Sequence, residues 1–153
     1  MSIRELIKED IPKLVEMAFL YKQSQNPNFE ESRKQVIAET FQGVFSQPNT
    51  KALICLNPQG LITGYILFHL LYCPIIGGKE IYVSDLFINE NERGKGIGSS
   101  LIAKAEHFAR ENQCVRLMLN NLKESEGYRR DFYKKQGFTE RTAIANYVKL
   151  LKE

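Results

Sequence analysis

Residues 93–100, with the sequence RGKGIGSS, hold the residue types and spacing that point most directly to chemistry. Three glycines alternate with Lys95 and Ile97, between an apolar strand-like stretch and an amphipathic helix-like stretch. Glycines let the backbone turn several N–H groups toward one point, and the unpaired amides of a first helical turn add partial positive charge there. An exposed helix N-terminus stabilises an anion by only about 0.3–1 kcal/mol, so Arg93 and Lys95 are expected to act as cationic partners. The pattern predicts a diphosphate site.

Two other interpretations of this segment are open. A turn that only caps a helix needs one or two glycines and no flanking cations, and the segment exceeds that need. A dinucleotide fingerprint needs G-x-G-x-x-G after the first strand and an acidic residue about 20 positions further on. Here the spacing is G-x-G-x-G, the preceding strand is not the first, and the following strand ends in Asn120 and Asn121. Anion binding therefore fits better than nicotinamide cofactor binding.

The elements that must position this loop follow from apolar periodicity and turn residues. Before the loop, the patterns predict a short strand (3–6) and two helices (11–25 and 29–45). A hairpin follows, with strands 51–56 and 61–72 around the turn 57–60, and then a further strand (79–88). Asp10 is expected to cap the first helix, with Pro12 in its first turn.

After the loop, the patterns predict a helix (97–108), a strand (114–120) and a helix (125–136) that ends at Gly137. Two closing strands are predicted over residues 138–141 and 146–151. A strand, a glycine turn, a helix and a strand in that order imply a right-handed crossover. The predicted fold class is α/β: one mixed central sheet flanked by helices on both faces, in the order β-αα-βββ-α-β-α-ββ.

Two motifs at their observed spacing carry a resemblance to a known family. A loop pattern Gln/Arg-x-x-Gly-x-Gly/Ala is present as Arg93, Gly96 and Gly98, and a pattern F-Y-x-x-x-G-F is present as residues 132–138. Together, and in this element order, they resemble the GNAT family of acetyl-CoA-dependent N-acetyltransferases. The strand that contains Asp85 is also similar, more narrowly, to the same strand of diamine (spermidine/spermine-type) acetyltransferases.

The resemblance implies one N-acetyltransferase domain over residues 1–153, with the pantetheine arm of acetyl-CoA paired along the strand that ends at Ile88. It implies that acetyl-CoA is bound by that strand end, by the loop and by the end of the next strand, through Leu86, Phe87, Ile88, Arg93, Gly94, Lys95, Gly96, Ile97, Gly98, Ser99 and Asn120. The chain departs from its relatives at two positions. Glu126 stands where an Asn is common, and Ser84 stands where diamine acetyltransferases have a Glu.

Direct attack on a thioester needs a neutral amine and a proton for the departing thiolate. Deprotonating a lysine-like amine at pH 7 costs about 4.6 kcal/mol. Asp85, between Val83 and Phe87, is the nearest candidate base, and we expect burial to raise its pKa. A water chain to Glu80 or to an acid of the first two helices is an equally open route. Tyr133 is the candidate general acid that the resemblance implies, because an aimed phenol can protonate a thiolate.

Composition limits the other classes of function. The chain has 153 residues, 43% of them hydrophobic, and a formal charge of +3, which fits a globular domain and is too small a charge for a nucleic-acid binder. The longest apolar run, residues 65–76, is interrupted by His69 and is shorter than the ~17 residues that span a bilayer. With charged residues near its start, the chain is expected to be cytoplasmic and without a membrane partner.

Cysteine and histidine usage predicts no metal. Cys55, Cys73 and Cys114 are odd in number and widely spaced, which is typical of reduced thiols. His69 and His107 have no partner at metal-ligand spacing, and we expect both to be structural or solvated.

We therefore predict an acetyltransferase that uses acetyl-CoA as cosubstrate and acts on a small-molecule or peptide amine, with a homodimer as its expected assembly. Glu16, Glu30 and Glu31 of the first two helices favour a cationic acceptor such as a polyamine. The alternatives are a CoA-binding sensor with weak turnover and an anion-binding interaction module.

Overall fold

The computed structural model describes residues 1–151, and its chain divides into two compact units, Met1–Asn120 and Asn121–Glu153. The first unit holds the central sheet and three long helices, and the second holds two short helices. The expectation of one domain over residues 1–153 stays a prediction.

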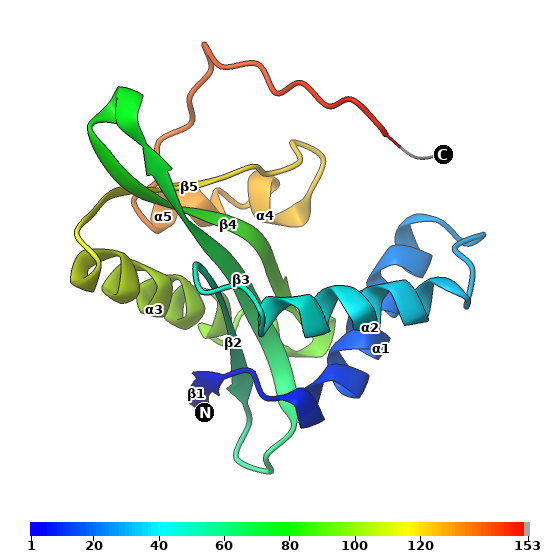
Figure 1. The fold of residues 1–153 in the computed structure, drawn as a ribbon. Coiled ribbons are helices and arrows are strands. Elements are labelled where there is room, and N and C mark those ends of the chain that lie inside the picture. The colour runs from blue at the N-terminus through cyan, green and yellow to red at the C-terminus, as the bar shows by residue number, and fades with distance from the viewer. Residues whose placement is uncertain (152–153) are drawn as a thin grey trace. The chain divides into compact units, whose positions relative to one another are not determined.

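The first unit is built on a mixed five-stranded sheet (Figure 1). Its strands lie in sequence order, antiparallel from the first to the fourth, and the fourth pairs in parallel with the fifth. The strands are β1 (Ser2–Glu5), β2 (Thr50–Leu56), β3 (Ile62–Cys73), β4 (Gly78–Ile88) and β5 (Cys114–Leu119). The parallel pair is connected through helix α3 (Ile97–Glu111), as the crossover rule predicted.

Helices cover both faces of this sheet, and Figure 1 shows α1 and α2 on one side and α3 on the other. Successive strand residues point to opposite faces, so alternate β3 residues meet different helices. Tyr65 packs edge-on against Phe41 of α2 (Arg33–Val44), with ring centroids 5.6 Å apart. Phe68 instead meets Phe108 of α3, at 5.3 Å. The predicted fold class, a mixed sheet with helices on both faces, is confirmed.

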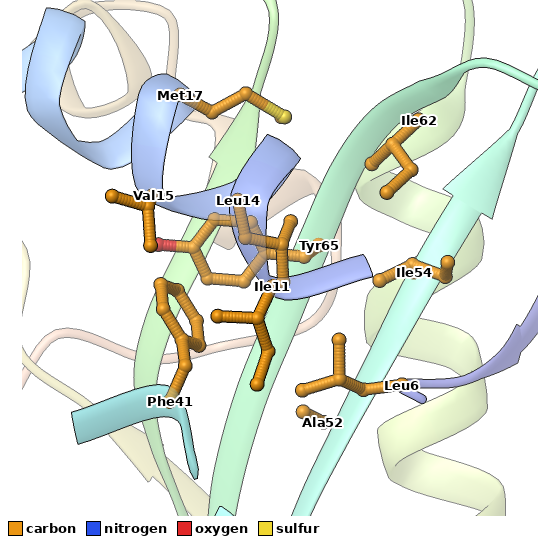
Figure 2. Close-up of a cluster of buried hydrophobic side chains, with 10 residues drawn as sticks. All are labelled: Leu6, Ile11, Leu14, Val15, Met17, Phe41, Ala52, Ile54, Ile62 and Tyr65. Atoms are coloured by element: carbon orange, nitrogen blue, oxygen red, sulfur yellow. The ribbon is translucent and has the colours of Figure 1, made fainter. Parts of the chain in front are cut away.

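The core on the first of these faces joins α1 (Ile11–Gln25) and α2 to β2 and β3. Its buried side chains, drawn in Figure 2, belong to Leu6, Ile11, Leu14, Val15, Met17, Phe41, Ala52, Ile54, Ile62 and Tyr65. Leu14 and Ile54 are fully buried. Burying a large aliphatic side chain contributes about 1.5–3 kcal/mol, so this cluster holds the two helices on the sheet.

Asp10 stands at the N-cap position of α1, as predicted, but its side chain makes no capping hydrogen bond to the helix. Its carboxylate accepts two hydrogen bonds from the Arg4 guanidinium, at 2.7 and 2.8 Å, and one from the Ile7 amide at 2.9 Å. The hydrogen bonds from Arg4 lower the pKa of Asp10, and burial opposes them without reversing the shift. The acid therefore ties β1 to the turn before α1 instead of satisfying helix amides.

The predicted helix over residues 125–136 is interrupted. The second unit has two short helices, α4 (Glu126–Arg129) and α5 (Phe132–Lys135), separated by Asp131, whose φ of 52° is left-handed. Asp tolerates this conformation better than most residues, so the chain can turn there. Gly137 ends α5 with a φ of 86°, which confirms it as a C-cap residue.

The two predicted closing strands, 138–141 and 146–151, are wrong. The structure has no helix or strand over residues 138–151. Tyr147, Val148 and Leu150 are 91%, 77% and 83% exposed. Strand preference depends on a paired and half-buried surface, and within residues 1–151 this segment has no strand to pair with. The observed order is therefore β-αα-βββ-α-β-αα.

Two smaller predictions can also be compared with the structure. The second helix begins at Arg33, four residues later than expected, because residues 26–32 form turns. The three cysteines are free thiols, as predicted, although only Cys55 is fully buried. Over the part of the chain that the structure describes, no helix is long and apolar enough to cross a membrane.

Candidate functional site

The end of β4 carries an unpaired backbone edge. Parallel pairing with β5 stops at Val83 and Leu119, but β4 continues to Ile88 and still pairs with β3 on its other side. Within residues 1–151, no strand pairs with the β5-facing side of residues 85–88. Leu86, Phe87 and Ile88, which the resemblance implies as cofactor-binding residues, lie on this unpaired edge.

The glycine loop begins just beyond this edge. Gly94 and Gly96 have φ angles of 77° and 79°, in the left-handed region that favours glycine. Gly96 is the N-cap of α3, and the Ser100 amide makes the first return bond, 3.0 Å to the Gly96 carbonyl. The amides of Ile97, Gly98 and Ser99 precede that bond, so they belong to the first helical turn, where amides lack an intrahelical acceptor. The loop presents several donors at one helix terminus.

The two cations of the loop are each placed beside a carboxylate. Lys95 Nζ lies 3.0 Å from Glu92 Oε2, and Arg93 Nη1 lies 3.8 Å from Glu90 Oε1. Arg93 Nε also donates to the Ile88 carbonyl at 3.3 Å, which ties the loop to the end of β4. These acids offset part of the positive charge that the sequence indicated, so an anion would be held mainly by the backbone amides.

A bulge in β4 sets which side chains share a face. Val83 lies opposite Phe68 and Asp85 lies opposite Leu67, so Ser84 is the extra residue between the two pairs. Asp85 thus lies on the face of Leu67, which α1 and α2 cover further along. The expected burial of Asp85 is wrong, because its side chain is exposed. Its charge still raises the pKa of Tyr65, after the larger effect of burial.

Asn120 follows β5 directly and reaches back to β4. Its Nδ2 donates to the Tyr82 hydroxyl at 3.4 Å. Asn120 therefore lies beside the point at which β4 and β5 stop pairing.

Tyr133, the candidate general acid, belongs to α5 in the second unit. Its ring packs edge-on against Phe132 and Phe138, with centroids 4.9 and 5.8 Å away. Burial raises the pKa of its phenol. The group is therefore fully protonated at neutral pH, as a proton donor must be. The other predicted site residues all belong to the first unit.

Two of the helix acids are engaged within the protein. Lys34 Nζ lies 2.8 Å from Glu16 Oε1 and 2.7 Å from Glu31 Oε1, and these acids raise the pKa of Lys34. Glu16 thus connects α1 to α2, whereas Glu31, just before α2, pairs with Lys34 in the first turn of that helix. One lysine offsets one of the two negative charges.

The sequence predicts that His69 is structural or solvated, and the structure places it in a polar row beside the bulge. Its two ring nitrogens contact Thr50 and Ser84 on the neighbouring strands. The signal that could have identified the row is strand register, which places Thr50 directly opposite His69. In residues 1–151, no cluster of three or more metal-ligating side chains is present.

These features agree with the comparison to known proteins. Residues 12–138 match the model of the Acetyltransferase (GNAT) family, and the chain belongs to that family. Members of this family use acetyl-CoA as cosubstrate.

Curated relatives match a shorter stretch. The thialysine N-epsilon-acetyltransferase of Bos taurus is 36% identical over 64 residues, which are 41% of this chain and 37% of the relative. The matched stretch is thus well under half of either protein.

Solved structures share the whole fold at low sequence identity. An integron cassette protein from the mobile metagenome of Cole Harbour Salt Marsh superposes with a TM-score of 0.82 at 19% identity, covering 99% of this chain and 91% of that one. An aminoglycoside acetyltransferase from an uncultured soil metagenomic sample, in complex with sisomicin, has a TM-score of 0.77 at 22% identity and covers 99% and 96%.

Proposed function

We propose that this protein transfers the acetyl group of acetyl-CoA to a primary amine by direct attack, without a covalent enzyme intermediate. The observation that carries the proposal is the continuous backbone surface from the open edge of β4 to the left-handed glycines before α3. Such a surface offers strand-like hydrogen bonds followed by converging amide donors. Acetyl-CoA has the matching chemistry, since its pantetheine arm carries amides and ends in a diphosphate.

The binding roles follow from position. Leu86, Phe87 and Ile88 would pair with the pantetheine amides, and residues 94–99 would donate their backbone N–H groups to the diphosphate. Arg93 and Lys95 would add charge-assisted bonds by exchanging their present carboxylate partners for phosphate, and Asn120 would contact the arm beside β5.

The reaction forms one bond and breaks another. The amine nitrogen attacks the thioester carbonyl, the C–N bond forms, and the C–S bond breaks as CoA departs as a thiolate. The ammonium form of the acceptor loses one proton before the attack, and the nitrogen loses a second proton once the C–N bond has formed. The thiolate gains one proton, so one proton in total is released to solvent. Asp85 is our candidate for accepting the proton of the amine, because its exposed carboxylate lies on β4 at the open edge.

Tyr133 is our candidate for protonating the thiolate. Its raised pKa keeps the proton on the phenol until sulfur carries negative charge, and the phenolate is then reprotonated by solvent. Because a phenol is a weaker acid than a thiol, this transfer is uphill and must accompany C–S cleavage.

The acceptor is an amine whose identity we leave to assay. Candidates include thialysine, from the relatives that are 36% identical over part of the chain, and also polyamines, aminoglycosides, amino acids and peptides. A cytoplasmic location and a homodimer are further predictions from the sequence.

Binding and turnover are tested separately. Acetyl-CoA at a hundredfold excess over its Kd should raise the free energy of unfolding by about 2.7 kcal/mol, seen as a higher Tm. Release of CoA thiol across the amine panel then measures transfer. No thermal shift would contradict acetyl-CoA binding and favour an interaction module, whereas binding without thiol release from any acceptor would favour a CoA sensor.

A Tyr133→Phe variant tests the general acid. We expect kcat to fall by about 10²-fold or more, with the Kd for acetyl-CoA nearly unchanged. Tyr147→Phe is the matched control, because Tyr147 is in the same unit, is 91% exposed and should leave kcat unchanged. Turnover of Tyr133→Phe at the rate of the control would remove the assignment.

A further inference from the structure

A row of polar side chains crosses β2, β3 and β4 beside the open edge. Thr50 Oγ1 lies 2.9 Å from His69 Nδ1, and His69 Nε2 lies 3.0 Å from Ser84 Oγ. The Tyr82 ring stacks on the imidazole at a centroid distance of 6.4 Å and an interplanar angle of 23°. Both ring nitrogens thus have a hydroxyl partner, and the stacked ring restrains the imidazole plane.

The hydrogen-bond inventory of this row allows two arrangements of its protons. Ser84 has one hydroxyl proton, which can go either to the Leu67 carbonyl, 3.3 Å away, or to His69 Nε2. In the first arrangement Nε2 carries the ring proton and Nδ1 accepts from Thr50. In the second Nδ1–H donates to Thr50 Oγ1 and Nε2 accepts from Ser84. Both ring nitrogens keep a hydroxyl partner in both arrangements, so a proton can move along the row without leaving the imidazole unpaired.

The row ends at the place where an acceptor amine must arrive. Ser84 is the bulge residue of β4 and the first residue beyond the last pair with β5, Val83 and Leu119. Its side chain is exposed. An amine directed at a thioester along this open edge would therefore approach the Ser84 hydroxyl.

We propose that Ser84 and His69 form the proton exit for the acceptor amine; this proposal rests on the acetyl-transfer function proposed above. The ammonium gives its proton to Ser84 Oγ while Ser84 passes its own proton to His69 Nε2, and Nδ1–H donates to Thr50. The imidazolium then releases the proton to solvent. An imidazole suits this task because it can accept a proton on one nitrogen while the other nitrogen donates.

Other ionisable groups on this face have distinguishable roles. Glu80 and Tyr82 precede the bulge on β4, and the Glu80 carboxylate is held by Arg116 at 2.6 Å. The Tyr82 hydroxyl accepts from Asn120. Asp85 is the exposed anion next to Ser84, so it would stabilise the ammonium and the imidazolium, and it competes with His69 for the role of proton acceptor.

The test compares His69→Gln and Ser84→Ala with His107→Gln. His107 is the other histidine, 69% exposed on α3, and its replacement should leave the rates unchanged. We expect His69→Gln to lower kcat/KM for the amine at pH 7 by about 10²-fold. The defect should shrink as pH approaches the pKa of the free amine, about 10.4, because a neutral amine has no proton to lose before it attacks. The Kd for acetyl-CoA should stay unchanged.

Ser84→Ala keeps the test decisive if His69→Gln folds poorly, since Ser84 is exposed. It should show the same pH-dependent loss. The relay is overturned if either variant keeps the wild-type pH profile, if the loss is equal at every pH, or if Asp85→Asn alone reproduces the pH-dependent loss. Failure of the proposed function would instead appear in the wild-type protein, as no thiol release with any amine, and it would overturn the relay with it.

Discussion

The left-handed conformation of Gly96 provides a quantitative test of the diphosphate site. Gly96 has a φ of 79°, and a Cβ added there would meet no heavy atom within 4 Å. The cost of Gly96→Ala is therefore conformational, about 1–2 kcal/mol for an L-residue in the left-handed region. If the variant keeps the loop conformation, its free energy of unfolding falls by this amount. If the loop relaxes instead, acetyl-CoA must restore the left-handed conformation when it binds, and its binding free energy is weakened by a similar amount.

Gly77→Ala is a matched control for this substitution. Gly77 has a φ of 71°, with no heavy atom within 4 Å of an added Cβ, and it lies in the connection between β3 and β4. The local conformational cost is the same, but the residue is at the end of β4 remote from the glycine loop. For a chain of this length, a loss of 1–2 kcal/mol lowers Tm by about 2–8 °C.

The two variants should separate in their affinity for acetyl-CoA. We expect Gly96→Ala to raise the Kd by about 5–30-fold, the equivalent of 1–2 kcal/mol, and Gly77→Ala to leave it unchanged. Isothermal titration calorimetry measures the Kd, and thermal unfolding without ligand measures the cost to stability. Wild-type stability without ligand would mean that the loop of Gly96→Ala has relaxed, and wild-type affinity in that case would refute the assignment of the loop to the diphosphate. Equal weakening in both variants would also refute it.

Two further substitutions test the scaffold around the site. In Gly64→Ala the new Cβ would lie 2.6 Å from the Phe87 carbonyl oxygen. The open edge of β4 must therefore shift, and we expect a loss of about 1–3 kcal/mol in urea unfolding, with weaker acetyl-CoA binding. The control Gly43→Ala, in a helix with open space, should gain up to about 1 kcal/mol; equal stability of the two variants would contradict the clash. The second substitution is Arg4→Gln. Arg4 lowers the pKa of Asp10, so in acid the folded state binds fewer protons than the unfolded chain. The stabilisation by this pair is therefore complete above the usual carboxyl pKa of about 3.9. It is lost as pH falls through the lower pKa of the folded state. Arg4→Gln should flatten the decline of unfolding free energy in acid, and an identical pH slope in both proteins would disprove this linkage.

The glycine loop could be predicted from the sequence because its cause is local. Gly94 and Gly96 adopt a conformation that disfavours other residues, so the spacing itself encodes the turn. Gly98, the third glycine, has no positive φ and lies in the first turn of α3. The apolar period of the helix was equally local, and Leu101 and Ala105 are fully buried as expected.

Strand register could not be predicted because it depends on irregularities with no local signal. A tight turn over residues 57–60 would pair Leu56 with Leu61. The structure pairs Leu56 with Ile62 and Cys55 with Gly64, so one irregularity shifts every later pair. The position of Thr50 opposite His69 depends on that shift. A histidine that looks structural in the sequence therefore becomes part of a polar row only when the strands are paired.

The second unit shows a different limit of sequence reasoning. The apolar residues of 146–151 have strand-like character, but they are exposed in a segment without a strand partner among the described residues. The helix predicted over 125–136 breaks at Asp131, where the Asp131 amide bonds to the Tyr128 carbonyl at 3.0 Å and ends the first short helix. Neither outcome follows from apolar periodicity, because both depend on backbone partners.

The bulge at Ser84 links the geometry of the open edge to the chemistry proposed for it. If β4 alternated regularly through Ser84, that residue would lie on the face of Tyr82, and Asp85 and Phe87 would point toward α3. The bulge instead places Asp85 on the face of Leu67, and Phe87 stacks on Tyr65 with centroids 5.9 Å apart. Both polar groups thus come to one face at the residue where β5 stops pairing. Deleting Ser84 would leave Val83 and Asp85 as consecutive residues opposite Phe68 and Leu67, so Asp85 would keep its face and only the Ser84 hydroxyl would be lost.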